Sequence, residues 1–181
     1  MEWLLLLFFL PFIATLMFFN WLEEKFYSFR DIEKLAEGEI LLSEKKYLEA
    51  QIFFTEKLKL FPKSSKAYYF RAKVNLVLEN YFSALYDIEQ SISFDHTVAE
   101  CFVLKGKILF KLKEFDKAFL EFDKADWFYR SGNAETLRWR GMSRYLIGQV
   151  ENAVIDFKRA VELGDEDADF ILKTKFEYIR K

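Results

Sequence analysis

The sequence predicts an all-α protein in which one membrane-spanning helix precedes a stack of helical hairpins. Three observations support this fold class: helix-breaking residues are scarce, a long N-terminal segment carries no charge, and a side-chain pattern recurs after residue 30. The 181 residues include only 2 prolines and 6 glycines. Few positions therefore interrupt a helix, and no Gly/Ser-rich or Pro-rich linker divides the chain.

The uncharged N-terminal segment covers residues 3–22. A helix of about 20 residues reaches about 30 Å, the thickness of the hydrocarbon core of a bilayer. Trp3 and Trp21 stand at its two ends, where indole rings anchor among headgroups, and Pro11 lies inside it, where a membrane helix tolerates a kink. We predict a single-pass transmembrane anchor that contacts membrane lipid through residues 3–22 and, with a short flank, occupies residues 1–27.

Two alternatives for this segment are a cleaved signal peptide and an apolar helix buried in a soluble core. A signal peptide normally begins with basic residues and ends in small ones, whereas this segment follows Glu2 and is followed by Glu23. A core helix should carry a polar stripe, and residues 3–22 have none. The membrane anchor is therefore the favoured interpretation.

Basic residues near the segment predict its orientation. Lys25, Arg30 and Lys34 follow it, and no Lys or Arg precedes it. Because basic residues are enriched on the cytoplasmic side of membrane helices, we expect the rest of the chain in the cytoplasm. A periplasmic or other extracytoplasmic location is the alternative.

A repeated pattern of three columns begins after residue 30. A small residue is followed twelve positions later by alanine, and a large apolar residue comes four positions after the alanine. Successive copies lie 34, 34 and 35 residues apart. We expect the glycine of one helix and the alanine of its partner to let two helices approach closely. The columns are Gly38, Ala72, Gly106 and Gly141; Ala50, Ala84, Ala118 and Ala153; and Phe54, Ile88, Phe122 and Phe157.

These columns resemble the tetratricopeptide repeat (TPR), a helical hairpin of about 34 residues. The resemblance, to bacterial-type repeats in particular, implies that residues 28–181 form an α-solenoid of about four hairpins and a C-terminal capping helix. The repeats fall at about 31–64, 65–98, 99–133 and 134–167, and the capping helix at 168–181. In that last segment Leu172, Phe176 and Ile179 share one face, as a helix covering the end of an array requires.

Nothing in the sequence predicts catalysis. His96 is the only histidine and Cys101 the only cysteine, so neither a disulfide within the chain nor a zinc site of several such ligands can form. No glycine-rich phosphate-binding motif occurs. We therefore predict no enzyme activity, no cofactor, no metal and no small-molecule substrate. The net charge of -2 leaves no excess positive charge for nucleic acid.

The TPR resemblance implies that the first helices of the repeats form a concave groove for a peptide or helix of a protein partner. At the implied inward places the chain has aromatic and basic side chains, which suit a ligand with apolar anchors and acidic groups. A solvated inner wall without a ligand is the alternative. The predicted groove residues are Tyr69, Lys73, Lys107, Phe110, Arg138, Met142 and Tyr145.

Three consecutive aromatic residues, Trp127, Phe128 and Tyr129, form a second candidate contact. With Arg130 after them they make four bulky residues near a loop, which exceeds what a helix-end contact requires, and aromatic side chains are enriched at interfaces. Packing beneath the fourth repeat explains them equally well.

One TPR subset grips the C-terminal carboxylates of chaperones with a set of lysines, asparagines and an arginine. The corresponding places here hold apolar and acidic residues, so the resemblance does not extend to that clamp. These residues are Leu35, Glu39, Phe70, Glu100 and Leu104.

The anchor and the repeats together predict a membrane-anchored TPR scaffold or adaptor that mediates protein–protein interactions or complex assembly. The alternative is a constitutive accessory subunit of a larger membrane protein complex. In that case other subunits would permanently cover the aromatic surface of a chain with 19% aromatic residues.

Overall fold

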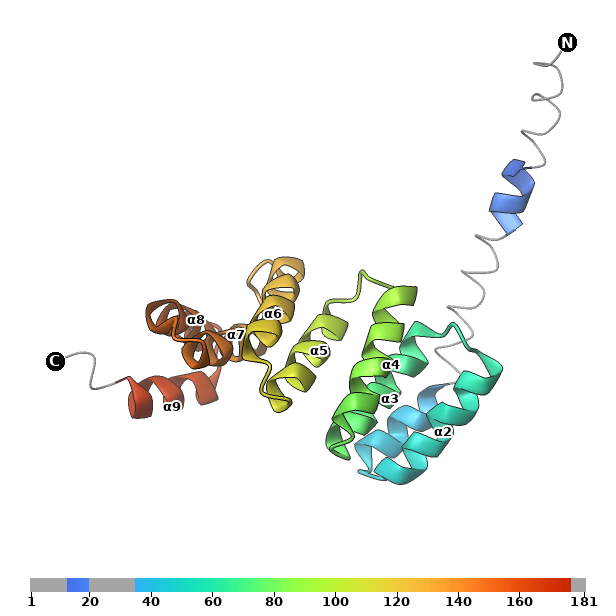
Figure 1. The fold of residues 1–181 in the computed structure, drawn as a ribbon, viewed down its shortest axis with the longest axis horizontal. Coiled ribbons are helices and arrows are strands. Elements are labelled where there is room, and N and C mark those ends of the chain that lie inside the picture. The colour runs from blue at the N-terminus through green and yellow to red at the C-terminus, as the bar shows by residue number, and fades with distance from the viewer. Residues whose placement is uncertain (1–12, 20–34, 177–181) are drawn as a thin grey trace, which may run out of the picture.

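The computed structural model describes residues 13–19 and 35–176, which form helices joined by short turns. Helical residues 35–43 begin the array, and the labelled helices of Figure 1 follow in order. Their bounds are α2 Tyr47–Leu60, α3 Ser65–Val77, α4 Tyr81–Phe94, α5 Ala99–Lys111, α6 Phe115–Tyr129, α7 Ala134–Leu146, α8 Val150–Glu162 and α9 Glu166–Lys175. The prediction of an all-α fold is confirmed for the described residues.

The helices form consecutive hairpins. α3 packs on α4, α5 on α6 and α7 on α8, while residues 35–43 pack with α2 around one apolar cluster. Because α3 also contacts α5, and α5 contacts α7, the hairpins stack along the long axis of Figure 1. This is the predicted α-solenoid. We call the side formed by residues 35–43, α3, α5 and α7 the inner face, and the side formed by α2, α4, α6 and α8 the outer face. Places within a repeat are counted from residues 31, 65, 99 and 134.

The glycines of the pattern make room for aromatic rings. A Cβ atom added to Gly106 would lie 2.6 Å from the ring of Phe122, and one added to Gly141 would lie 2.9 Å from the ring of Phe157. Both rings are completely buried. The closest approach of each glycine is to the ring four residues after the alanine of the partner helix, a contact that the sequence did not predict.

Three polar side chains start helices at the ends of repeats, and the first is Ser64, whose Oγ accepts a hydrogen bond from the Ala67 amide at 3.2 Å before α3. Asn133 Oδ1 accepts a hydrogen bond from the Thr136 amide at 2.8 Å, and Asp165 Oδ1 accepts one from the Ala168 amide at 2.7 Å. Each thereby satisfies an amide that has no partner within its own helix. Helix starts therefore coincide with the ends of the first, third and fourth repeats.

The helix α9 covers the last hairpin, as expected of a capping helix, although it begins two residues earlier than predicted. Phe176 follows it and is buried, with its ring centroid 5.3 Å from that of Tyr145 and 5.7 Å from that of Phe157. Leu172 packs against the same cluster. Ile179 lies outside the described residues.

Most of the predicted transmembrane segment, and the basic flank after it, lie outside the described residues. Residues 13–19 are described, are helical, and have exposed side chains, with Met17 exposed to 69%. This exposure does not fit the alternative of a helix buried in a soluble core. Within residues 13–19 and 35–176, no helix is both long enough and apolar enough to cross a bilayer.

Candidate functional site

A charged pair links the two helices of the second, third and fourth hairpins. A basic residue at place 7 faces an acidic residue at place 23, and both side chains are largely buried in the second and fourth hairpins. The sequence contains this signal, which was not among the predictions: a cation is followed sixteen residues later by an acid in three consecutive repeats. The pairs are Arg71 and Asp87 at 2.7 Å, Lys105 and Glu121 at 3.7 Å, and Arg140 and Asp156 at 2.7 Å.

A second set of charged pairs joins neighbouring repeats across the inner face. Glu39 binds Lys66 at 3.0 Å, and Lys107 binds Glu135 at 2.6 Å, in each case place 9 of one repeat with place 2 of the next. Lys73 and Glu100 hold these places between the second and third repeats, but no ion pair joins them in the part of the chain that the structure describes. The inner face is therefore left open at this junction.

A hollow of about 210 Å³ lies at the open junction. Burial, with smaller effects from Cys101 and Glu100, raises the pKa of the Tyr69 hydroxyl to about 12, so this group remains a neutral donor. Burial opposes ionisation of Glu135, but the hydrogen bond and charge of Lys107, with smaller effects from Trp139 and Arg138, together outweigh it and lower the pKa of that carboxyl. We call this hollow the inner hollow; it is lined by Tyr69, Lys73, Glu100, Val103, Leu104, Lys107, Tyr129, Asn133 and Glu135.

Three of the predicted groove residues, Tyr69, Lys73 and Lys107, meet at the inner hollow. Phe110 lies farther along α5, where its ring contacts that of Trp139 with centroids 5.2 Å apart. Phe110 therefore contributes packing between the third and fourth repeats, outside the hollow.

The last three predicted groove residues lie near the C-terminal end of the array. Arg138 binds Asp165 at 3.0 Å and Asp167 at 3.3 Å. Met142 and Tyr145 are half-buried against the core of the fourth hairpin. Because Arg138, like Lys107, has acidic partners, the inner face is mixed in charge and not basic as expected from the sequence.

The three aromatic residues at the end of α6 have separate roles. Trp127 is exposed to 75%. Phe128 stacks on Phe102 of α5 with centroids 5.4 Å apart, which is packing within the third hairpin. Tyr129 lines the inner hollow, and burial together with the nearby Glu100 carboxylate raises the pKa of its hydroxyl. The sequence grouped three side chains that the fold directs to different places.

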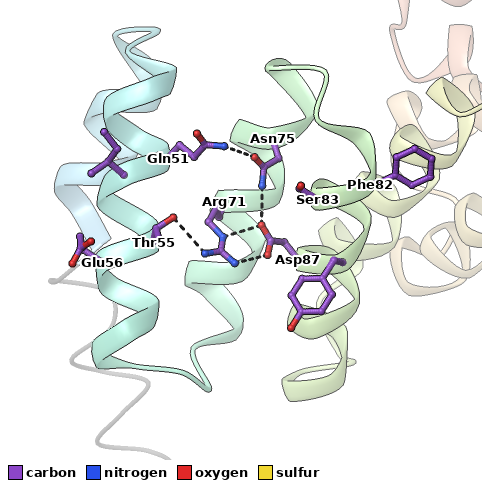
Figure 2. A pocket seen from close by; sticks show the side chains of 10 residues that line it. Gln51, Thr55, Glu56, Arg71, Asn75, Phe82, Ser83 and Asp87 are labelled. Atoms are coloured by element: carbon purple, nitrogen blue, oxygen red, sulfur yellow. Dashed lines mark hydrogen bonds and ion pairs between the residues drawn. The ribbon is translucent and has the colours of Figure 1, made fainter.

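A larger groove, of about 590 Å³, lies between α2 and α4 on the outer face, and sequence reasoning missed it. Figure 2 shows a hydrogen-bonded network across its floor. Gln51 Nε2 donates to Asn75 Oδ1 at 2.6 Å, and Asn75 Nδ2 donates to Asp87 Oδ2 at 2.9 Å. We call it the outer groove; it is lined by Gln51, Ile52, Thr55, Glu56, Arg71, Asn75, Phe82, Ser83, Tyr86 and Asp87.

The single cysteine and the single histidine lie in different environments, one buried and one exposed. Cys101 is buried in the core, and burial raises the pKa of its thiol, which disfavours the reactive thiolate. His96 is exposed in the turn after α4. Among the places of the chaperone clamp, Leu35, Phe70 and Leu104 are buried apolar side chains.

Comparison with known proteins agrees with this architecture. The family model described as anaphase-promoting complex, cyclosome, subunit 3 matches residues 31–125. Hsp70-Hsp90 organizing protein 1 of Glycine max is 37% identical over 86 residues, which are 48% of this chain and 15% of that protein. Hsp70-Hsp90 organizing protein 2 of Arabidopsis thaliana is 33% identical over 92 residues, which are 51% of this chain and 16% of that protein. The matched region is thus only a small part of these relatives.

Solved structures share the fold. YrrB, described as a TPR protein with an unusual peptide-binding site, has a TM-score of 0.69 at 21% identity, over 81% of this chain and 76% of its own. A crystal structure of MamA has a TM-score of 0.67 at 20% identity, over 75% of this chain and 79% of its own. The first TPR of Spaghetti (RPAP3), bound to an HSP90 peptide, has a TM-score of 0.61 at 18% identity, over 65% of this chain and 94% of its own. Because the family model covers more than half of the sequence, the chain belongs to that family and is a TPR protein.

Proposed function

We propose that the chain is a scaffold that holds a protein partner at the inner hollow, while its N-terminal segment keeps the repeat array at a membrane. The observation that carries the first part is the open junction between Lys73 and Glu100. The equivalent charged pairs are closed on both sides of it, between Glu39 and Lys66 and between Lys107 and Glu135. A partner carboxylate can therefore bind the Lys73 ammonium without displacing an existing ion pair.

The chemistry of the inner hollow favours an extended peptide with an acidic side chain. The Tyr69 hydroxyl is a neutral donor for a backbone carbonyl. Glu100 interacts with the Tyr129 hydroxyl and, as a carboxylate, has further capacity to accept from a backbone amide. The Lys73 nitrogen lies 5.8 Å from the Tyr69 ring centroid, so an acid bound there would also contact an aromatic surface. The buried apolar side chains at the clamp places argue against recognition of a chain-terminal carboxylate by that route.

Reversing the charge at Lys73 tests this proposal. The full chain in detergent, as wild type, Lys73→Glu and Lys158→Glu, would be used to capture proteins from native membranes, with recovery quantified by mass spectrometry. Lys158 is exposed on the outer side of α8 and serves as the matched control. We expect the main partner to fall by about tenfold with Lys73→Glu alone, since a charge-assisted hydrogen bond is replaced by repulsion. Equal recovery with both variants would contradict binding at the inner hollow.

The uncharged run of residues 3–22, with its described part exposed, supports the membrane anchor. We expect the full chain to stay in the membrane pellet after alkaline carbonate extraction, and a chain lacking residues 1–27 to move to the supernatant. Protease added to right-side-out vesicles should spare a cytoplasmic repeat domain. Release of the full chain by carbonate, or digestion in intact vesicles, would contradict the anchor or the orientation respectively.

A constitutive accessory subunit is the second candidate, and exposed aromatic side chains favour it. Phe82 is exposed to 79% and Trp127 to 75%, and a permanent partner subunit would cover such aromatic side chains, which are enriched at interfaces. Size-exclusion chromatography of the full chain in detergent distinguishes the two: an adaptor elutes as one monodisperse species, whereas an accessory subunit aggregates without its complex.

A further inference from the structure

Arg71 and Arg140 hold the same place in the second and fourth repeats and bind the acid of their own hairpin in the same way. Arg71 donates to Asp87 from Nε at 2.9 Å and from Nη2 at 2.7 Å. Arg140 donates to Asp156 from Nε at 3.1 Å and from Nη2 at 2.7 Å. Each guanidinium thus has one nitrogen, Nη1, that its own hairpin does not use.

The two Nη1 atoms have different partners. Nη1 of Arg140 donates to two carboxylates of the preceding outer helix, Asp123 at 2.9 Å and Asp126 at 2.7 Å. In the described part of the chain, Nη1 of Arg71 has only a long contact of 3.4 Å to the Thr55 hydroxyl. The first repeat carries Thr55 and Leu58 at the places of Asp123 and Asp126. Arg71 therefore lacks the two carboxylates of the preceding helix that accept hydrogen bonds from Nη1 of Arg140.

Lys105, at the same place in the third repeat, shows that a carboxylate from the preceding helix is the rule at the other junctions. Its ammonium lies 3.1 Å from Glu89, which precedes it on α4, and 3.7 Å from Glu121 of its own hairpin. Glu89 and Asp123 both occupy place 25. The neutral Thr55 makes the junction of the first two repeats the exception.

The space beside Arg71 is open for a ligand. At the junction of the third and fourth repeats, Arg144 donates to Asp156 at 2.7 Å and lies over the Phe119 ring at 5.2 Å. The equivalent of Arg144 at the first junction is the shorter Asn75, and the equivalent of Phe119 is Gln51. These two side chains bond to each other on the floor and leave the outer groove above them (Figure 2).

We propose that the outer groove binds a partner segment in which an aspartate or glutamate lies between apolar residues, with its carboxylate accepting a hydrogen bond from Nη1 of Arg71. The partner carboxylate takes the position that Asp123 and Asp126 take beside Arg140. Arginine accommodates this second carboxylate because its planar fork presents separate donors to separate acids. The two other charged groups of the groove are both paired, Asp87 with Arg71 itself at 2.7 Å and Glu56 with Lys59 at 2.7 Å.

The rim of the outer groove matches the apolar part of such a segment. Ile52 on α2 is exposed to 66% and Tyr86 on α4 to 58%. One helical turn earlier, at place 18, the two helices carry the exposed apolar residues Leu48 and Phe82. The third and fourth repeats have acids at that place, which would repel an acidic partner, so the site is confined to the first junction; these acids are Asp116 and Glu151.

This site is on the face opposite to the proposed partner site, so either proposal can fail without the other. The decisive variant is Thr55→Asp, which gives Arg71 the carboxylate that Asp123 gives Arg140. Because it adds an ion pair and changes no core residue, its thermal unfolding midpoint should be unchanged or raised by about 2 °C. Thr55→Asn, of similar size and without charge, is the matched control. Loss of binding in Thr55→Asp could then not be attributed to unfolding.

The probes are two short capped peptides, one with a central glutamate flanked by leucines and a twin with glutamine in its place. Binding to the full chain in detergent is measured by fluorescence polarisation. We expect wild type and Thr55→Asn to prefer the glutamate peptide by about fivefold, and Thr55→Asp to lose that preference.

Three outcomes would overturn the proposal. The first is equal binding of the two peptides to wild type, and the second is no binding of either. The third is an undiminished preference in the Thr55→Asp variant. If sedimentation instead shows that Thr55→Asp dissociates a dimer of the full chain, the occupant is a second copy and the proposed partner segment is wrong.

Discussion

The first two repeats and the last two repeats use the same hairpin but close the space between hairpins differently. At the junction of the third and fourth repeats, Arg140 contacts three carboxylates and Arg144 lies over Phe119. At the junction of the first two, the neutral Gln51 and Thr55 stand at the corresponding places of the preceding helix, and a groove of about 590 Å³ remains. Packing within a hairpin is therefore common to the array, whereas polar side chains between hairpins decide where the array is open.

Removing the two arginines should break this comparison most strongly. Arg140→Met leaves Asp123 and Asp126 without their cation, while Asp156 keeps Arg144, so we expect a loss of about 3–5 kcal/mol in the free energy of unfolding. Arg71→Met leaves only Asp87, which keeps its hydrogen bond from Asn75, and should lose about 1–3 kcal/mol. Urea unfolding followed by circular dichroism measures both values. Equal losses would show that the additional carboxylates at Arg140 contribute nothing to stability.

Replacing the small residue and the large apolar residue of one repeat by those of another tests the packing within hairpins. The second repeat combines Ala72 with Ile88, whereas the third combines Gly106 with Phe122. Gly106→Ala should cost about 1–3 kcal/mol, because the added methyl meets the buried ring. Adding Phe122→Ile reproduces the pair of the second repeat and should recover part of this loss. A double-mutant cycle with no coupling energy would contradict direct contact as the cause.

Turn residues give a smaller difference between the repeats. Place 15 has a left-handed backbone in each hairpin, with φ of 59° at Glu79 in the second repeat and 84° at Gly148 in the fourth. Glycine adopts this conformation without strain. We expect Gly148→Ala to cost about 1 kcal/mol and Glu79→Gly to stabilise by about 0.5 kcal/mol. Thermal unfolding of the two variants should therefore shift in opposite directions.

The closed and open charge pairs of the inner face should differ in their dependence on pH. The folded-state pKa of Glu135 lies below its usual value near 4.5 because, against burial, Lys107 lowers it through a hydrogen bond and its charge, with smaller effects from Trp139 and Arg138. The stabilisation is thus present above that value and is lost as pH falls through the folded-state pKa. Lys107→Met should remove this small acid-dependent loss from the thermal unfolding midpoint. Lys73→Met should leave it unchanged, and an equal effect of both variants would contradict the open junction.

Much of the fold could be predicted from the sequence because the same helix-packing residues recur at a regular interval along the chain. The small residue, the alanine and the large apolar residue recur at constant spacing, and the described hairpins follow that spacing. The helix starts at Asn133 and Asp165 follow from local hydrogen bonding of their own side chains. The contact of each glycine with a ring was not predicted, since the direction of a side chain across a hairpin depends on the crossing of two helices.

The candidate site was predicted less completely. Tyr69, Lys73 and Lys107 do lie together, but Arg138 lies outside the inner hollow and is bound by Asp165 and Asp167. The outer groove was not predicted because it depends on two small or neutral side chains, Asn75 and Thr55. Other repeats have larger or charged side chains at these places. Aligning the repeats place by place would have identified these two exceptional positions. The transmembrane anchor and its orientation remain predictions.

The sequence by itself determined the class of this protein: period, helix ends and the alternation of small and large residues are local or strictly repeated, so they can be interpreted without coordinates. Only the tertiary structure decided which charges are paired, which remain open, and which face has a groove. Those properties depend on distances between side chains of neighbouring repeats, and a change of one residue, such as Thr55 in place of an acid, alters them without changing the fold.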